Sequence, residues 1–291
     1  WAKQGSGTVS LGGSSSYTGG TAINNGKVLI TTGNNRLPTG TVVSLGQSSS
    51  TNLGTLDLNG FNQQIAGLNS TTGTNSGTGN NTVTSTAAAT LTLGGADTYS
   101  YGDGSNANSG IISGALSVVK DGTGTQILGD TNSYTGTTTV NKGKLVINGN
   151  ISTSSLTTVN DGGTLGGGGT VGSVTVKSGG TLAPGGSAGI LSTGSAIIES
   201  GAALGIEINS GTVGTGYDQL NVTGTVSLAG LLNIAMGFTP ADGGLFFLIA
   251  NDGTDAITGA FSNAPIQGAT YKLGGQDFKI SYSGDSATNS F

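Results

Sequence analysis

The chain contains an internal duplication that restricts the folds open to it. Residues 120–147 repeat residues 3–30 at a constant offset of 117 positions (120 − 3), without a gap. Roughly half of the paired positions are identical, a fidelity that predicts a repeat architecture. The identical pairs include Gly5/Gly122, Gly7/Gly124, Thr8/Thr125, Leu11/Leu128, Tyr17/Tyr134, Gly19/Gly136, Thr21/Thr138 and Gly26/Gly143. Residues 3–30 are the first copy and residues 120–147 the second copy below.

The composition is far from that of an ordinary globular domain. Glycine accounts for 57 of 291 residues and charged residues for 8%, against averages of about 7% and about 25%. Only 4 residues are proline, which excludes collagen and proline-rich linkers. Because Val, Leu and Ile recur in spaced pairs that stacking can bury, an ordered fold is predicted rather than disorder.

Several classes of chemistry are excluded by missing residue types. The chain has no Cys and no His, which removes disulfides, thiolate sites, the most common metal ligand and every His-containing catalytic triad. We therefore predict no enzyme activity, no cofactor and no metal site. The net charge of −5 is spread without a basic patch, so neither nucleic acid nor an anionic membrane is an expected partner.

The sequence shows neither a membrane span nor a targeting segment. No apolar run approaches the ~20 residues that cross a bilayer. The chain opens WAKQGSG, already inside the first copy and without an initiating Met. We expect both ends of this sequence to be cut sites. The lack of a targeting segment here therefore says nothing about whether the full protein has one.

A shorter period follows the second copy and predicts the fold. A β-branched residue, two polar residues and a glycine recur at 140–143, 159–162, 176–179 and 198–201, and also at 23–26. A leucine follows in the four later cases, as Leu145, Leu165, Leu182 and Leu204. The leucines are 20, 17 and 22 residues apart, enough for one circuit of about three short strands and their corners.

Stacking such circuits gives an all-β parallel β-helix, or β-solenoid. Each strand lies beside its equivalent in the next coil, about 4.8 Å away. The glycine supplies the positive φ of a tight corner, and the leucine points inward over the leucine of the coil below. We predict that residues 1–210 form this solenoid.

Three segments depart from the regular pattern. Residues 69–82 and 94–110 are polar and of low complexity, so we expect them to be protruding loops. Residues 211–291 hold most of the phenylalanines and a run at 245–249 that predicts a longer apolar strand. We interpret residues 211–291 as an aromatic-rich C-terminal β cap, or as a continuation of the solenoid, because an open last coil would expose a sheet edge.

The second copy resembles the autotransporter-associated β-strand repeat, also called the passenger-associated transport repeat. The residues that carry this resemblance are Gly122, Gly124, Thr125, Leu128, Gly129, Asn132, Tyr134, Gly136, Thr138, Gly143 and Leu145. The first copy has Ser15 where the family has Asn and Val28 in place of Leu. Residues 56–65 and 217–224 are also similar to stretches common in such proteins. The resemblance implies a right-handed β-helical stalk on a large bacterial surface or secreted protein.

The candidate site residues are structural corner residues rather than reactive groups. They are Gly5, Gly7, Tyr17, Gly19, Gly26, Gly122, Gly124, Asn132, Tyr134, Gly136, Gly143, Gly162, Gly179 and Gly201. Tyr17 and Tyr134 could be sugar-stacking platforms, but packing against a neighbouring coil is favoured. Asp252 and Asp255 lie within a few residues of each other and are the candidates for paired catalytic carboxylates, but a Gly/Asn-rich segment favours a solvated turn.

The favoured function is that of a structural extracellular or bacterial cell-surface protein. It would form a rigid β-helical rod, with self-association into a head-to-tail or lateral filament or sheath as a further expectation. The alternative is an adhesin or glycan-binding passenger domain whose ligand, a glycan or another cell-surface molecule, binds the segments 69–82 and 94–110. A glycoside hydrolase or lyase is third, because the acids are sparse.

Overall fold

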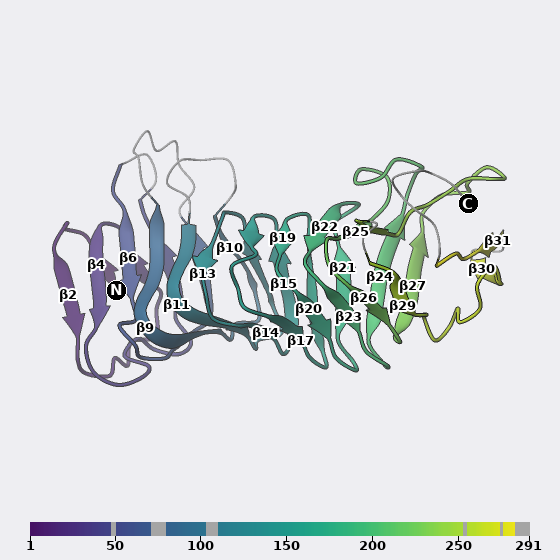
Figure 1. The fold of residues 1–291 in the computed structure, drawn as a ribbon. Coiled ribbons are helices and arrows are strands. Elements are labelled where there is room, and N and C mark those ends of the chain that lie inside the picture. The colour runs from purple at the N-terminus through teal and green to yellow at the C-terminus, as the bar shows by residue number, and fades with distance from the viewer. Residues whose placement is uncertain (48–50, 71–79, 103–109, 253–254, 274–275, 283–291) are drawn as a thin grey trace. The chain divides into compact units, whose positions relative to one another are not determined.

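A computed structural model describes residues 1–47, 51–70, 80–102, 110–252, 255–273 and 276–282 (Figure 1). The described residues form strands and turns, with no helix among them, which confirms the predicted all-β class. The chain divides into two compact units, Trp1–Ser155 and Leu156–Phe291. The division predicted at residue 210 rests on a change in amino-acid composition and stays a prediction.

Unit 1 consists of strands joined by glycine-rich corners, and most of the strands are short, whereas β9 and β11 have 13 and 11 residues. Its strands are β1 Ala2–Lys3, β2 Thr8–Leu11, β3 Thr21–Ile23, β4 Gly26–Ile30, β5 Val42–Leu45, β6 Gly54–Asp57, β7 Gln63–Ile65, β8 Gly67–Ser70, β9 Asn81–Leu93, β10 Thr98–Tyr101, β11 Gly110–Lys120, β12 Thr125–Leu128, β13 Ser133–Tyr134, β14 Thr138–Val140, β15 Gly143–Ile147 and β16 Asn150–Ile151.

These strands stack in parallel ladders, side by side in Figure 1. The ladders run in the orders β1-β3-β5-β8, β2-β4-β6-β9-β11-β14 and β10-β12-β15, while β7 pairs with β9 and β13 with β11. Neighbours in a ladder belong to successive coils, and the pairings within unit 1 are parallel. Residues 19 to 29 positions apart are thereby brought into register, which confirms the predicted parallel β-helix.

Unit 2 repeats this organisation. Its strands are β17 Thr157–Val159, β18 Gly163–Gly167, β19 Thr170–Val171, β20 Val174–Val176, β21 Thr181–Pro184, β22 Ile190–Thr193, β23 Ala196–Ile198, β24 Ala203–Ile208, β25 Gln219–Val222, β26 Val226–Leu228, β27 Leu231–Met236, β28 Ile249–Asn251, β29 Ile257–Gly259, β30 Thr270–Leu273 and β31 Gln276–Lys279. Parallel ladders run β17-β20-β23-β26-β29, β18-β21-β24-β27 and β19-β22-β25-β28, and β30 and β31 form an antiparallel hairpin.

The core of each unit consists of columns of inward side chains. In unit 2, the leucines after the corner glycines are in register, Leu165 with Leu182 and Leu182 with Leu204, and Leu232 extends the column. All four are buried. Alternate residues on these strands face outward, so the polar Ser and Thr side chains stay solvated while the columns exclude water.

Two expectations about loops need correction. The prediction that residues 94–110 are a loop is wrong for β10, Thr98–Tyr101, whose alternation turns Tyr99 and Tyr101 into the core. The Tyr101 hydroxyl donates to the carbonyl of Asn81 at 2.8 Å, so an aromatic residue in polar sequence is buried with its polar atom satisfied. Within 69–82, β8 extends to Ser70 and β9 begins at Asn81, and residues 71–79 and 103–109 lie outside the described part.

The C-terminal region differs in part from its prediction. The apolar run at 245–249 is not one strand, since only Ile249 belongs to β28 and Leu245 is exposed. Phe246 instead packs edge-on against Tyr217 and Phe238, at ring-centroid distances of 5.4 and 6.1 Å. The ladders of unit 2 stay parallel up to β29, and the role of this region as a cap stays a prediction. Within the described residues, no helix has the length and apolarity needed to cross a membrane.

Candidate functional site

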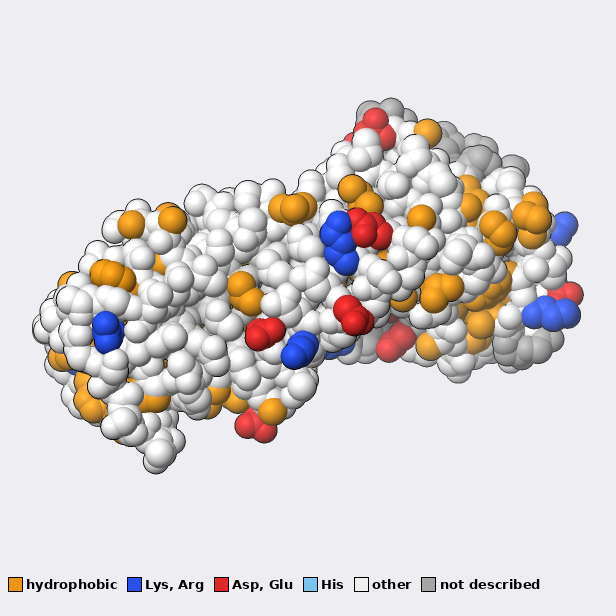
Figure 2. Space-filling model, turned by 90° about the horizontal axis from the view of Figure 1, so that it is seen from below, with side chains coloured by type: hydrophobic (Ala, Val, Ile, Leu, Met, Phe, Trp, Pro, Cys, Tyr) orange, Lys and Arg blue, Asp and Glu red, His pale blue; other side chains and the backbone are white. Residues whose placement is uncertain are grey.

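Ionisable side chains do not gather into a reactive cluster in the described part of the chain. No group of three His, Cys, Asp or Glu residues is arranged there to hold a metal ion. On the face drawn in Figure 2, charged side chains stand singly or in small groups with uncharged surface between them. Near Asp252 and Asp255, the Asn251 side-chain amide donates to the backbone carbonyl of Asp255, and residues 253–254 lie outside the described part.

The corner glycines let one coil lie directly on the preceding corner. Gly26 has a φ of 76° and Gly143 a φ of 65°. A Cβ at either position would come closer than 3.0 Å to two backbone carbonyl oxygens, those of Gly5 and Gly7 or those of Gly122 and Gly124. Gly162, Gly179 and Gly201 also have positive φ, of 77°, 79° and 79°. The Gly162 amide donates to the Gly179 carbonyl, and the Gly179 amide to that of Gly201. Conformation therefore favours glycine at all five corners, and at Gly26 and Gly143 the space beside the backbone requires it as well.

The remaining glycines differ between the two copies. In the second copy, a Cβ would come closer than 3.0 Å to the preceding coil at Gly122, Gly124 and Gly136. In the first copy, nothing lies within 4 Å of a Cβ at Gly5, Gly7 or Gly19. The glycines of the motif are thus packed tightly against the preceding coil in the second copy, and they have open space beside them in the first copy.

A buried lysine begins each copy and binds the corner of its own coil and of the next. The Lys120 side chain, 1% exposed, is in register with Leu93 and Val140 in an otherwise apolar column. Its Nζ donates to the carbonyls of Gly122 and Lys142. Lys3 makes the equivalent bonds to the carbonyls of Gly5 and Asn25. Burial lowers the pKa of Lys120 below its ordinary value, and nearby Asp121 acts in the opposite direction.

A relay of hydroxyl groups joins two coils in each copy. In the second copy, the Tyr134 hydroxyl lies 2.7 Å from Thr138 Oγ1, which lies 2.9 Å from Ser154 Oγ. Ser154 Oγ donates to the carbonyl of Gly136 at 3.0 Å. Because each hydroxyl has one proton and that of Ser154 goes to Gly136, Thr138 donates to Ser154 and Tyr134 donates to Thr138.

The first copy contains the same relay. Tyr17 bonds Thr21 at 2.6 Å, Thr21 bonds Thr41 at 2.9 Å, and Thr41 donates to the Gly19 carbonyl at 3.1 Å. Tyr134 is fully buried and burial raises its pKa well above the ordinary value of 10.0. Tyr17 is half-buried, and its pKa is raised by this partial burial and lowered by the bond to Thr21. Both hydroxyls are thus occupied within the coil stack.

Buried amide side chains make hydrogen bonds that the main chain of a neighbouring strand would otherwise make in the ladders. Gln126 accepts from the Leu68 amide at 2.9 Å and donates to the Leu68 carbonyl at 3.0 Å. Gln63 makes the same pair of bonds with Leu37, at 3.0 and 3.1 Å. Asn132, at the family's Asn position, accepts from the Ile112 amide at 2.9 Å. Each amide group satisfies main-chain groups that would otherwise be buried without partners.

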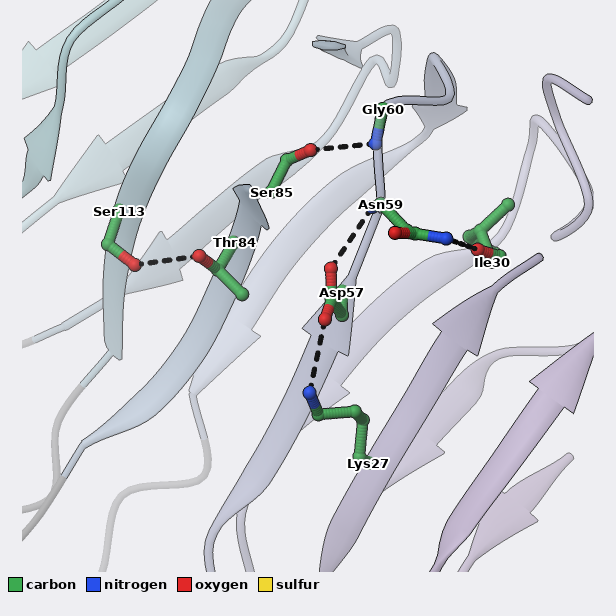
Figure 3. A network of polar contacts seen from close by, with 8 residues as sticks. All are labelled: Lys27, Ile30, Asp57, Asn59, Gly60, Thr84, Ser85 and Ser113. Carbon is green, nitrogen blue, oxygen red and sulfur yellow. Dashed lines mark hydrogen bonds and ion pairs between the residues drawn. The ribbon is translucent and has the colours of Figure 1, made fainter. Parts of the chain in front are cut away.

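A polar network in unit 1, closer to the surface, also forms hydrogen bonds with main-chain groups of neighbouring coils (Figure 3). Lys27 Nζ lies 3.1 Å from Asp57 Oδ2, and Asp57 Oδ1 accepts from the Asn59 amide at 3.0 Å. The Asn59 side chain then donates to the Ile30 carbonyl of the neighbouring coil at 3.1 Å. Asn59 has a φ of 49°, so these contacts hold a non-glycine residue in the left-handed region. Beside it, the Gly60 amide donates to Ser85 Oγ at 2.9 Å.

The buried lysines and glutamines were not among the residues predicted from the sequence, although the sequence carried a signal for the lysines. Lys3 and Lys120 are identical across the duplication. Lys120 also alternates with Leu116 and Val118, which places it on the inward face of β11. Gln63 and Gln126 have no comparable signal, because their partners are 26 and 58 residues away in the sequence.

The ladders, corner glycines and buried polar contacts define a β-solenoid repeat protein whose two long repeats use equivalent side chains for equivalent contacts. Residues 2–30 and 118–147 match the family described as passenger-associated-transport-repeat. The chain therefore carries two passenger-associated-transport repeats, which confirms the resemblance drawn from its residues.

The chain is also similar to a much longer curated protein. Over 75 residues it is 51% identical to the "Adhesin BmaC autotransporter" of Brucella suis biovar 1 (strain 1330). The match covers 25% of this chain and 2% of that relative. The matched stretch thus corresponds to a small part of that relative.

Proposed function

We propose that this chain is a non-enzymatic stalk segment of a bacterial surface or secreted passenger protein. The observation that carries the proposal is the equivalence of the two copies: Lys3 and Lys120, and Tyr17 and Tyr134, direct their polar atoms at equivalent partners within the coil stack. Such contacts fix the register of successive coils and leave these groups unavailable for chemistry. The passenger-associated-transport repeats and the autotransporter relative support a cell-surface or secreted location.

Labelling of intact cells tests the location. Antibodies raised against the purified chain are applied to unpermeabilised cells that make the protein, alongside antibodies against a cytoplasmic protein as a control. Surface labelling that is lost after brief treatment of the cells with protease is expected, with the chain or its fragments recovered from the medium if it is secreted. Labelling only after permeabilisation would refute the proposal.

Adhesion is the second candidate function, because the relative is named an adhesin. In this version two segments, the parts of the predicted loops 69–82 and 94–110 that lie outside strands β8 to β11, contact a glycan or another cell-surface ligand. Purified protein is compared with a variant in which both segments are replaced by Gly/Ser sequences of equal length, on glycan arrays and on host cells. Binding by the parent that the variant loses supports adhesion, and no binding by either protein favours a stalk without adhesive function.

Self-association into a filament or sheath stays a prediction from the repeat sequence. Electron microscopy of the purified protein at high concentration tests it directly. Filaments with an axial repeat near the length of one subunit are the expected result, whereas isolated particles at every concentration would contradict it.

A further inference from the structure

The described part of the chain contains six pairs in which an asparagine or an aspartate directly precedes a glycine. Such pairs are prone to succinimide formation, because glycine has no side chain to hinder the attack of its amide nitrogen on the preceding side-chain carbonyl. The asparagine pairs begin at residues 25, 59 and 148, and the aspartate pairs begin at residues 121, 161 and 242. Two further pairs, 103–104 and 252–253, include residues outside the described part.

In five of the six pairs, the glycine amide is hydrogen-bonded to a neighbouring coil. The amides of Gly26, Gly122, Gly149 and Gly162 donate to main-chain carbonyls at 2.9, 3.1, 3.1 and 3.2 Å, and that of Gly60 donates to Ser85 Oγ at 2.9 Å. Moving any of these nitrogens onto the preceding side chain breaks a contact between coils. Local opening of the stack therefore has to precede the reaction.

The pair Asp242–Gly243 lies in a turn between β27 and β28, and its glycine amide is free. Within the described residues, the Gly243 amide has no hydrogen-bond partner. One main-chain bond closes the turn, from the Gly244 amide to the Ala241 carbonyl at 3.1 Å. Gly243 has a φ of 81°, as the third residue of a type II turn requires. Only this one bond restrains the rotation that brings the Gly243 nitrogen to the Asp242 side chain.

Solvent exposure alone does not separate this pair from the others. Asp121 and Asp161 are exposed, as Asp242 is, and each directly precedes a glycine. The glycine amide that follows Asp121 or Asp161 is held by a neighbouring coil, whereas the amide that follows Asp242 has no partner in the described part of the chain. The three aspartates therefore differ in how far the next amide can move.

We propose that Asp242 is a site of spontaneous conversion to isoaspartate, and that the coil stack protects the other five pairs. The Gly243 nitrogen forms a bond to Cγ of Asp242, and one carboxyl oxygen leaves as water with the amide proton and a proton from solvent. Water then opens the cyclic imide. Cleavage of the bond from nitrogen to Cγ restores aspartate, and cleavage of the bond from nitrogen to the α-carbonyl carbon gives isoaspartate. The main chain then runs through the side chain of residue 242 and is one carbon longer.

The modified turn belongs to no strand of a ladder. It lies after Met236, where β27 ends, and before Ile249, where β28 begins. The extra main-chain carbon is therefore accommodated outside the pairings of β27 and β28. In an asparagine pair, ammonia leaves in place of water, so that the same reaction is a deamidation. The reaction needs no ligand and does not depend on the proposed function.

Two matched substitutions test the protection. Asp242→Asn and Asp161→Asn each place an exposed asparagine before two consecutive glycines, and mass spectrometry follows the loss of its amide in warm neutral buffer. In the folded protein, Asp242→Asn should lose its amide at least about tenfold faster than Asp161→Asn, because the second reaction requires local opening. Asn148 is present in both variants and should keep its amide over the same time. In denaturing urea the two rates should become equal.

The unsubstituted chain gives a second readout. In water enriched in heavy oxygen, each cycle of imide formation and opening adds one heavy oxygen atom at the reacting aspartate. The label should appear at Asp242 and not at Asp121 or Asp161, and fragmentation of the peptides distinguishes Asp242 from Asp252. Equal rates for the two variants in the folded protein would overturn the proposal. So would the absence of label at Asp242 after it has appeared there in the urea-unfolded chain.

Discussion

Replacing Tyr134 by Phe should change the pH dependence of stability in a predictable direction. The ring stays in its fully buried position, and only the hydroxyl that donates to Thr138 at 2.7 Å is removed. Thr138 and Ser154 keep their own donations along the relay, so the change deletes one hydrogen bond without leaving a buried donor unpaired. At pH 8 this loss lowers the free energy of unfolding by about 1 kcal/mol.

At alkaline pH the difference in stability between Tyr134→Phe and the parent disappears or changes sign. Burial raises the pKa of Tyr134 well above its ordinary value of 10.0, so the folded protein keeps the proton while the unfolded chain loses it. Stability from this group is complete below pH 10 and falls as the pH rises toward the folded-state pKa, by about 1.4 kcal/mol per pH unit at most. At pH 11 the parent has lost about 1.4 kcal/mol that the variant never loses. The variant is therefore about equal to the parent in stability there, or slightly more stable.

Urea unfolding of both proteins at pH 8, 9, 10 and 11 measures this crossing. The other buried tyrosines, including Tyr101, are present in both proteins and cancel in the difference. Tyr17→Phe is the matched control, because Tyr17 makes the same bond to its threonine but is only half-buried, so its difference should change less with pH. A difference between Tyr134→Phe and the parent that stays constant from pH 8 to pH 11 would refute the reasoning.

Three further substitutions and one control substitution test the other contacts. Gly143→Ala forces an L side chain into a φ of 65° and against two carbonyls. It should lower the free energy of unfolding by at least about 1–2 kcal/mol. Gly40→Ala, with nothing within 4 Å, should leave the urea midpoint unchanged. Lys120→Met removes the only donor group of this side chain from two corner carbonyls and should destabilise by about 1–2 kcal/mol at pH 7. Because the pKa of Lys120 is lowered, the stability of the parent should rise with pH between that pKa and the ordinary 10.5. The absence of this rise in Lys120→Met would confirm that it comes from Lys120. Gln126→Leu leaves both main-chain groups of Leu68 without their partner, and should speed exchange of the Leu68 amide and destabilise by about 2 kcal/mol. Unchanged exchange at Leu68 would contradict the role of the amide.

The regular part of the fold could be predicted because it depends on local periodicity. Inward leucines such as Leu182 and corner glycines such as Gly179 recur once per coil, and their positions follow from strand alternation and from the positive φ of a corner. The apolar run at 245–249 shows the limit of this reasoning. Its hydrophobicity predicts a strand, but Phe246 finds aromatic partners in Tyr217 and Phe238 instead of continuing a ladder.

The buried polar residues could not be predicted from composition, because the usual rule places lysine and glutamine in water. A solenoid corner changes that rule, since it points several main-chain carbonyls into one small volume. Lys120 is buried where carbonyls of two successive corners converge on its ammonium group. A carboxylate at that position would be repelled by the same carbonyls and an apolar residue would leave them unpaired, so the corner selects a long side chain that donates hydrogen bonds. The identity of Lys3 and Lys120 across the duplication thus has a physical cause, and it identifies the lysine as part of the repeat along with the glycines and the tyrosine.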